Sequence, residues 1–262
     1  MSYQWLNNPT IYETTHSISK QMSRYIQAGF NYPLLPIELY DEQSDAIMYG
    51  ILRGCTEVMG KSLQNKRNYV NIDHGYFTNR NVKPYFRITR NARHYGLKLL
   101  DLPDDRFSVH GVDIKDYNQT GNTIVILPPS PFWGQYDNID YKSWGINIKI
   151  LLETITDKEI IIKNKNDEKP LSEYLKNAYA LVHYSSMGAI EALLAGIPVL
   201  TLGPSFLSGY TSTDYKEINN LKLFDRTLLF NNLAYHQFSI NEVLHGTAKT
   251  ILNEIYKELD NE

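Results

Sequence analysis

The second half of the chain alternates short apolar runs with stretches whose apolar residues recur at helical spacing. Runs typical of buried strands occupy residues 123–127, 159–162, 179–182 and 197–202. The helical spacing lies between them, over residues 141–155, 171–178 and 187–195. A strand–helix succession repeated three times predicts a doubly wound parallel sheet, and therefore an α/β fold.

The first half is less regular. Residues 45–49 are typical of a strand that ends at Gly50, and the residues after it, 51–63, are typical of a helix. One helix over residues 45–63 is the alternative, because several apolar residues would then share a face. That helix would hold Gly50 and Gly54 in its interior at a cost of about 1 kcal/mol each, so we favour the strand, the glycine turn and the helix.

Two further elements and one boundary complete the predicted organisation. Residues 69–72 are expected to form a strand, and residues 247–259 carry apolar positions on one helical face. Polar residues and a glycine cluster over residues 112–121, which is the best candidate for a linker. The predicted domains are residues 1–121 and residues 122–262.

Composition excludes several classes of protein. The chain has 262 residues, which allows one or two domains, and its net charge of -3 gives no overall basic character of the kind a dedicated nucleic-acid binder shows. The single cysteine, Cys55, excludes an internal disulfide and fits a reducing compartment. We find no signal peptide and no apolar run long enough to span a bilayer, so we expect a cytoplasmic protein.

Residues 180–200 carry the most informative pattern, a buried strand followed by a turn of small residues and a helix start. Ser185 or Ser186 can cap this helix, and free amides at its start attract a phosphate or diphosphate. Glu191 lies about one and a half turns into the helix, where a carboxylate can accept both hydroxyls of a ribose. An ordinary strand–helix–strand unit with a capping serine is the alternative interpretation.

Several motifs together resemble a family of enzymes. They are Ser185-Ser186, Glu191-Ala192-Leu193 and Gly196-Ile197-Pro198-Val199 in the second half, with Gly50–Gly54, Asn71–Phe77, Tyr85–Asn91 and His236–Val243 elsewhere. This set is similar to two-lobed glycosyltransferases (GT-B fold) of the capsule and lipopolysaccharide type and to relatives in phage genomes. The family usually has a larger N-terminal lobe.

The resemblance implies two Rossmann-like lobes, the N-terminal one reduced, with residues 1–121 on the acceptor side and residues 122–262 binding a nucleotide sugar. The nucleotide sugar would be a co-substrate, and no further cofactor is implied. The expected donor-binding residues are Lys163, His183, Tyr184, Ser185, Ser186, Met187, Gly188 and Glu191. The expected acceptor-binding residues are Gly50, Arg53, Tyr76, Arg87, Arg90 and Asn91.

Asp73 and His74 are the candidates for catalysis. They follow a predicted strand and precede Gly75, so their side chains can project from a strand end. Transfer to a hydroxyl with inversion needs a general base, and either residue could serve. The alternatives are that Asp73 caps a turn and that His74 is an exposed tip.

Lys163 follows the predicted strand over residues 159–162 and could stabilise the charge of a leaving diphosphate. We find no Asp-x-Asp motif in a suitable loop, so we predict no metal and expect cationic side chains and amides to perform this role. For Lys165 and Lys169 a solvated charged loop is the better interpretation.

The acceptor is the least determined part. Between Lys66 and Lys98 the only acidic residue is Asp73, and Arg87, Arg90 and Arg93 stand among aromatic residues. Such a cluster suits contact with a polyanion, which favours a hydroxymethylated base of phage DNA, whereas the capsule-type resemblance favours a surface glycan. An exposed helix with a charged face is the plain alternative for the cluster.

Other activities lack their motifs. The chain has no Gly-x-x-x-x-Gly-Lys-Ser/Thr loop, no Gly-x-Gly-x-x-Gly turn, no Gly-x-Ser-x-Gly and no His-x-x-x-His pair. The sequence therefore predicts a glycosyltransferase. A non-catalytic nucleotide-sugar-binding protein and an epimerase of the same fold are the alternatives. The sequence leaves open the sugar, the nucleotide, the stereochemistry and the oligomeric state.

Overall fold

A computed structural model describes residues 4–77 and 85–261. The chain forms two compact units. Unit 1 comprises Met1–Asn91, Lys98–Gly111 and Leu228–Glu262, and unit 2 comprises Ala92–Leu97 and Val112–Thr227. The structure thus differs from the predicted boundaries, because the last 35 residues, 228–262, belong to unit 1.

Unit 1 is built on a six-stranded mixed sheet in the order β10-β5-β4-β3-β1-β2. The strands are β1 (Pro9–Glu13), β2 (Leu34–Pro36), β3 (Asp45–Tyr49), β4 (Tyr69–His74), β5 (Tyr85–Arg90) and β10 (Gln237–Ser239). The first four are parallel, and β5 runs antiparallel to both β4 and β10. The predicted strand over residues 45–49 is confirmed, and Gly50 follows it with φ 82.

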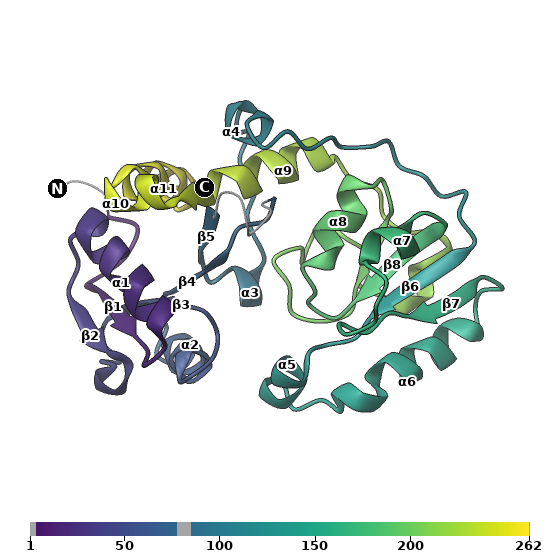
Figure 1. The fold of residues 1–262 in the computed structure, drawn as a ribbon, viewed down its shortest axis with the longest axis horizontal. Helices are drawn as coiled ribbons and strands as arrows, with labels where there is room; N and C mark the ends of the chain where they lie inside the picture. Colours follow the sequence, from purple (N-terminus) through teal and green to yellow (C-terminus); the bar gives the residue numbers. More distant parts are fainter. Residues whose placement is uncertain (1–3, 78–84, 262) are drawn as a thin grey trace. The chain divides into compact units, whose positions relative to one another are not determined.

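Helices cover both faces of this sheet (Figure 1). They are α1 (Ser17–Phe30), η1 (Ile37–Leu39), α2 (Cys55–Gln64), α4 (Asp105–Ser108), α10 (Ile240–Leu244) and α11 (Thr247–Leu259), and α9 (Arg226–Tyr235) leads into the unit. One core joins α1 and α11 to the sheet through Ile26, Phe30 and Leu252. The other joins α2 through Val58 and Met59. The C-terminal segment returns because its apolar face completes the first of these cores.

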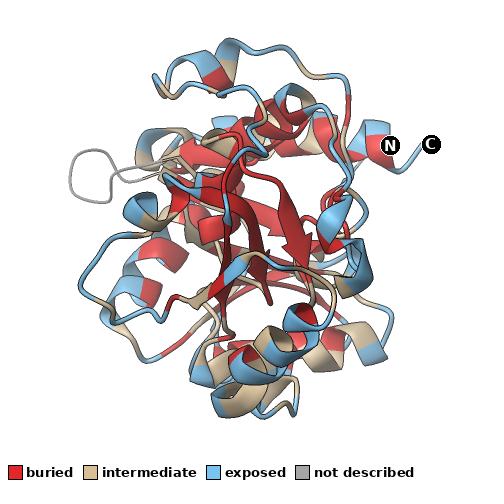
Figure 2. Ribbon diagram, turned by 90° about the vertical axis from the view of Figure 1, so that its right-hand side faces the viewer, coloured by how far each residue is buried: buried red, intermediate tan, exposed pale blue. Residues whose placement is uncertain are grey.

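Unit 2 is built on a parallel sheet in the order β7-β6-β8-β9. The strands are β6 (Thr123–Leu127), β7 (Glu159–Ile162), β8 (Ala178–His183) and β9 (Val199–Thr201). The helices are α3 (Ala92–Tyr95), α5 (Pro131–Tyr136), α6 (Tyr141–Glu153), α7 (Leu171–Leu175), α8 (Gly188–Leu194) and η2 (Tyr215–Asn219). Every residue of β6, β8 and β9 is buried, as the red strands in Figure 2 illustrate.

The two sheets share one strand order. The parallel strands lie in the order β2-β1-β3-β4 in unit 1 and β7-β6-β8-β9 in unit 2. In both units the second strand along the chain lies at one side, followed by the first, the third and the fourth, which is a Rossmann-like doubly wound order. The order reverses between the first and third strands, and ligands of such sheets bind there, outside the carboxyl ends of the strands. The predicted α/β class is confirmed. In unit 2 the reversal lies between β6 and β8, and in unit 1 between β1 and β3.

Among the described residues, no helix combines the length and apolar character that crossing a bilayer requires.

Candidate functional site

The donor-side candidate lies at the strand reversal of unit 2. Leu127 and His183 are paired at the ends of β6 and β8, and the turn over residues 184–187 leads directly from β8 into α8. This is the turn that the sequence predicts as a phosphate site. The side chains of this segment differ in whether they are exposed to a bound ligand.

His183 is fully buried and points into the protein. Its Nδ1 accepts a hydrogen bond from the Ser186 amide at 2.9 Å, and its Nε2 lies 2.8 Å from Thr201 Oγ1. Burial lowers the pKa of His183 to about 3, so the ring is neutral near pH 7. The expected donor contact therefore needs correction, because this side chain cannot reach a bound molecule.

Some backbone amides of the turn donate hydrogen bonds to groups within the protein. The Ser186 hydroxyl accepts a hydrogen bond from the Gly188 amide at 3.1 Å, so this hydroxyl holds the first amide of α8, whose N-cap position is Met187. The amides of Ser185 and Met187 have no hydrogen-bond partner among the residues the structure describes. Both residues are partly exposed, so two N–H groups and the Ser185 hydroxyl remain for a ligand.

Tyr184 is a structural residue. Its hydroxyl donates to Asp137 Oδ2 at 2.8 Å, and the same oxygen accepts from Arg93 at 2.5 Å. The Arg93 guanidinium also lies on the Trp133 ring, 3.3 Å from its centre. A β-carbon on Gly203 would approach the Tyr184 ring to 2.4 Å, so glycine is needed there. Burial raises the pKa of Tyr184, and the expected donor contact is replaced by a role in holding the turn.

Glu191 is the acidic group on the first turn of α8. Its side chain is exposed, and it forms no hydrogen bond or ion pair with any other residue in the described part of the chain. Partial removal of water by the surrounding protein raises its pKa. An unpaired carboxylate in this position suits the predicted contact with ribose hydroxyls.

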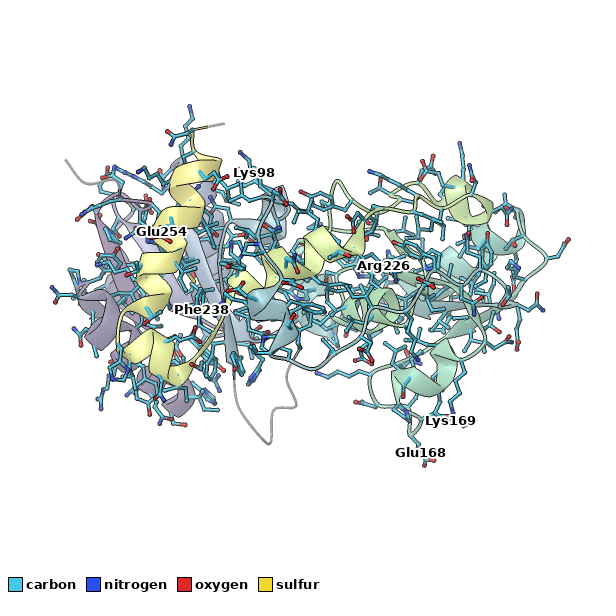
Figure 3. All side chains as sticks on the ribbon, turned by 90° about the horizontal axis from the view of Figure 1, so that it is seen from above. Lys98, Glu168, Lys169, Arg226, Phe238 and Glu254 are labelled. Carbon is cyan, nitrogen blue, oxygen red and sulfur yellow. The ribbon has the colours of Figure 1, made fainter. Side chains whose placement is uncertain are left out.

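Lys163 follows β7 but points into its own loop. Its Nζ donates to the carbonyl oxygens of Asn164 at 2.6 Å and Asp167 at 3.4 Å, and the residue is 8% exposed. The expected direct clamp on a diphosphate is therefore replaced by a buried cation held by carbonyl groups. Lys165 and Lys169 are exposed, and Figure 3 shows Lys169 pointing away from the ribbon.

In unit 1 the two catalytic candidates, Asp73 and His74, differ in their contacts. Both carboxylate oxygens of Asp73 are engaged, Oδ2 by Arg87 at 2.8 Å and Oδ1 by the amide of His74 at 2.8 Å. The His74 ring lies among aromatic rings, with its centre 6.5 Å from that of Tyr49 and 6.3 Å from that of Phe86. Asp73 is thus part of an ion pair, whereas the imidazole of His74 stands at the carboxyl end of β4.

The closing segment contacts the strand end that carries these residues. The Gln237 side-chain oxygen accepts hydrogen bonds from the amides of Tyr76 and Phe77, and its nitrogen lies 3.0 Å from His110 Nε2. Two motifs that are about 160 residues apart in the sequence therefore meet in one network. Burial raises the pKa of Tyr76 to about 12, so the phenol stays protonated.

Glu13 is a residue that the sequence did not single out. It ends β1, at the strand reversal of unit 1, and continues the register that pairs Tyr12 with Met48. Its Oε2 is buried and has no hydrogen-bond partner among the residues that the structure describes. No local sequence signal marks it, because its position depends on the order of strands in the sheet.

Gly50 and Arg53 lie in the loop after β3, at the same edge of the sheet. Gly50 donates its amide to Ile72 at 2.7 Å, and Arg53 has φ 56 and is exposed. Arg53 forms no hydrogen bond or ion pair with the residues described. Their contact with an acceptor stays a prediction.

Arg90 and Asn91 lie at the opposite end of the sheet, near the amino ends of the parallel strands. Strand β5 is antiparallel to β4, so Arg90 pairs with Val70 near the start of β4. The side-chain oxygen of Asn91 accepts a hydrogen bond from the Tyr69 amide at 2.9 Å. Arg90 is also paired with Asp260. The expected acceptor contact of these two residues needs correction, because ligands of this fold bind at the carboxyl ends of the parallel strands.

Arg87 and Arg90 therefore do not form one basic surface. Arg87 and Arg90 belong to unit 1, are an odd number of residues apart on one strand and so face opposite sides of the sheet, and Arg93 belongs to unit 2. Each has a carboxylate partner. Within residues 4–77 and 85–261, no group of three or more His, Cys, Asp or Glu side chains is arranged to hold a metal ion.

Comparison with known proteins agrees with this architecture. No protein-family model matches the chain, and no curated protein matches it by sequence. Among solved structures it resembles the KpsC β-Kdo 2,4 transferase of Thermosulfurimonas dismutans, with a TM-score of 0.52 at 12% identity over 91% of this chain and 98% of that chain. This chain shares the fold of that Kdo transferase. The KpsC β-Kdo 2,7 transferase of the same organism aligns with a TM-score of 0.49 at 14% identity, over 92% of this chain and 99% of that one.

Proposed function

We propose that this protein is a glycosyltransferase that moves a sugar from a nucleotide-sugar donor to a hydroxyl group of a glycan. The observation that carries the proposal is the turn after β8. It carries the amides of Ser185 and Met187 and leads into the helix that carries the Glu191 carboxylate, all three without a partner among the described residues, at the strand reversal of a doubly wound sheet. The shared fold with a Kdo transferase supports the same reaction class.

The donor would bind to unit 2. The free amides and the Ser185 hydroxyl would hold the phosphate or diphosphate, and Glu191 would accept the ribose hydroxyls. The buried ammonium of Lys163 has no carboxylate partner among the described residues, so its positive charge would favour an anionic ligand at the same sheet edge. Kdo is one candidate for the sugar.

The reaction would proceed by attack of the acceptor hydroxyl oxygen on the anomeric carbon. The bond from that carbon to the phosphate oxygen breaks, and the nucleotide leaves with the electron pair. If the enzyme inverts, His74 takes the hydroxyl proton, because the carboxylate of Asp73 is engaged by Arg87 and by a backbone amide. Asp73 would position His74 through that amide.

The arginines favour a glycan over DNA as the acceptor. The DNA hypothesis rests on Arg87, Arg90 and Arg93 acting as one basic surface. Each is paired with a carboxylate, and two of them face opposite sides of a sheet. A neutral or mildly charged oligosaccharide needs no such surface.

A thermal-shift screen tests the proposal. The purified protein is heated with a panel of cytidine, uridine, guanosine and thymidine sugar nucleotides, and a ligand that binds only the folded state must raise the melting temperature. We expect one nucleotide class to stabilise the protein, and Glu191→Ala to abolish that shift. A panel in which no nucleotide sugar stabilises the protein would contradict the proposal.

A further inference from the structure

His183 is the feature of the donor-side turn that the proposed chemistry leaves without a role. It is the last residue of β8 and is fully buried, yet histidine is a costly residue to bury unless its nitrogens are bonded. Both nitrogens have partners, on opposite sides of the ring. An apolar residue would fill the same place, so the bonds themselves need an explanation.

The tautomer follows from the partners. Nδ1 accepts the Ser186 N–H at 2.9 Å, so the ring proton resides on Nε2, which donates to Thr201 Oγ1 at 2.8 Å. Thr201 Oγ1 also accepts from the Thr211 hydroxyl at 2.7 Å. These three groups are buried and come from separate segments of unit 2.

The hydrogen bonds continue into the turn. The Ser186 hydroxyl accepts the Gly188 amide, so Ser186 is held through both its amide and its side chain. The inward-facing donors of the turn are thereby used inside the protein. The backbone donors of the turn that remain without partners in the described part of the chain are the amides of Ser185 and Met187.

We infer that His183 is a positioning residue for donor binding, which fixes the peptide of Ser186 so that the amides of Ser185 and Met187 face the phosphate of the nucleotide. The inference rests on the proposed function. It assigns to His183 a role through Ser186 and not a contact with substrate. A turn that is already fixed loses less conformational entropy when the ligand binds, which increases affinity.

Two conservative variants test the two ring nitrogens separately. His183→Asn places an amide oxygen near the position of Nδ1 and keeps an acceptor for Ser186, but it cannot reach Thr201. His183→Gln places an amide nitrogen near the position of Nε2 and keeps the donor to Thr201, but it leaves the Ser186 amide without its acceptor. Thr211→Val is the matched control, because it removes a buried hydroxyl of the same chain of bonds without touching the ring.

The readouts are affinity for CMP and UDP by calorimetry, amide hydrogen exchange of the turn and the melting temperature. We expect His183→Gln to weaken the binding of the preferred nucleotide about tenfold and to speed exchange at the turn, whereas His183→Asn and Thr211→Val stay within about threefold of the wild type. Equal losses in His183→Gln and His183→Asn, in proportion to their melting temperatures, would show a merely structural role.

The failure of this inference can be told apart from the failure of the proposed function. If the wild type binds neither nucleotide and no nucleotide sugar, the proposed function fails, and positioning for a donor fails with it. If the wild type binds and exchange at the turn is the same in His183→Gln as in the wild type, the positioning role alone is wrong.

Discussion

Asp73 and Arg87 stand opposite each other on β4 and β5, with Arg87 Nη2 2.8 Å from Asp73 Oδ2. The carboxylate that the sequence offers as a base is therefore half of an ion pair, and its second oxygen accepts the amide of His74. Because of this pairing we propose that His74, and not Asp73, takes the proton of the acceptor.

The first prediction concerns that transfer. His74→Gln should lower kcat by about 10²–10⁴-fold, the usual contribution of a general base, with little change in melting temperature. Asp73→Asn should lower kcat less and should cost stability, because it weakens the bond to Arg87. The measurement is kcat for both variants beside their thermal unfolding. A stable Asp73→Asn enzyme with the larger loss of kcat would reverse the assignment.

The second prediction concerns the ribose. Glu191→Ala should weaken nucleotide binding by about 1–3 kcal/mol, because it removes a charge-assisted hydrogen-bond acceptor. Calorimetry with the preferred nucleotide measures this. Glu173→Ala is the control, since Glu173 is also an exposed glutamate of unit 2 but is paired with Lys176. Equal affinity in Glu191→Ala and the wild type would remove Glu191 from the site.

The third prediction concerns pH. Burial lowers the pKa of His183 to about 3 and that of His236 to about 4, below the unfolded value near 6.5. Between these values the unfolded chain binds protons that the folded protein does not, so stability falls as pH falls from about 6.5. Each histidine contributes a slope of up to about 1.4 kcal/mol per pH unit.

Urea unfolding between pH 7 and pH 4.5 measures this slope. His183→Gln should unfold with a shallower dependence on pH than the wild type, whatever its absolute stability. An unchanged slope would mean that His183 is protonated in the folded protein.

The fourth prediction concerns the arginines. Arg93→Ala should lower the free energy of unfolding by about 1–3 kcal/mol, because it leaves Asp137 without its charged partner. Arg53→Ala, at an exposed position, should change it by less than about 0.5 kcal/mol. Urea unfolding compares the two variants. Neither should alter binding to DNA, and a selective loss of DNA binding in Arg93→Ala would revive the DNA hypothesis.

The fifth prediction concerns metal. Transfer should continue in the presence of EDTA, because we propose that amides and Lys163 stabilise the leaving phosphate. Initial rates with EDTA, and with added magnesium or manganese, measure the dependence. A rate abolished by EDTA and restored by either metal would show that the account of the leaving group is wrong.

Unit 2 was the predictable part of the fold. Its strands are continuous apolar runs separated by helical spacing, so β6 and β7 were predicted to the residue. The return of residues 228–262 to unit 1 was not predictable in this way. It depends on the pairing of Phe238 with Phe86, and such a contact between distant segments leaves no local pattern.

The site was predicted as a segment and less well as individual residues. The turn and Glu191 follow β8, and their contact with a donor stays a prediction, whereas His183 and Tyr184 are buried. His183 ends a strand that is buried on both faces, and this pattern could have indicated an internal side chain. Arg90 and Asn91 were misplaced because only the antiparallel pairing of β5 tells which edge of the sheet they occupy.

The most direct test of the central claim is transfer itself. The protein is incubated with the nucleotide sugar that stabilises it and with two acceptors, a capsule-type oligosaccharide and a duplex that contains hydroxymethylated bases, and both products are weighed by mass spectrometry. We predict that the oligosaccharide gains the mass of one sugar residue, that free nucleotide appears in equal amount, and that Glu191→Ala and His74→Gln lose both signals. Stabilisation by the nucleotide sugar with no mass gain on either acceptor would contradict the claim and would favour a non-catalytic nucleotide-sugar-binding protein.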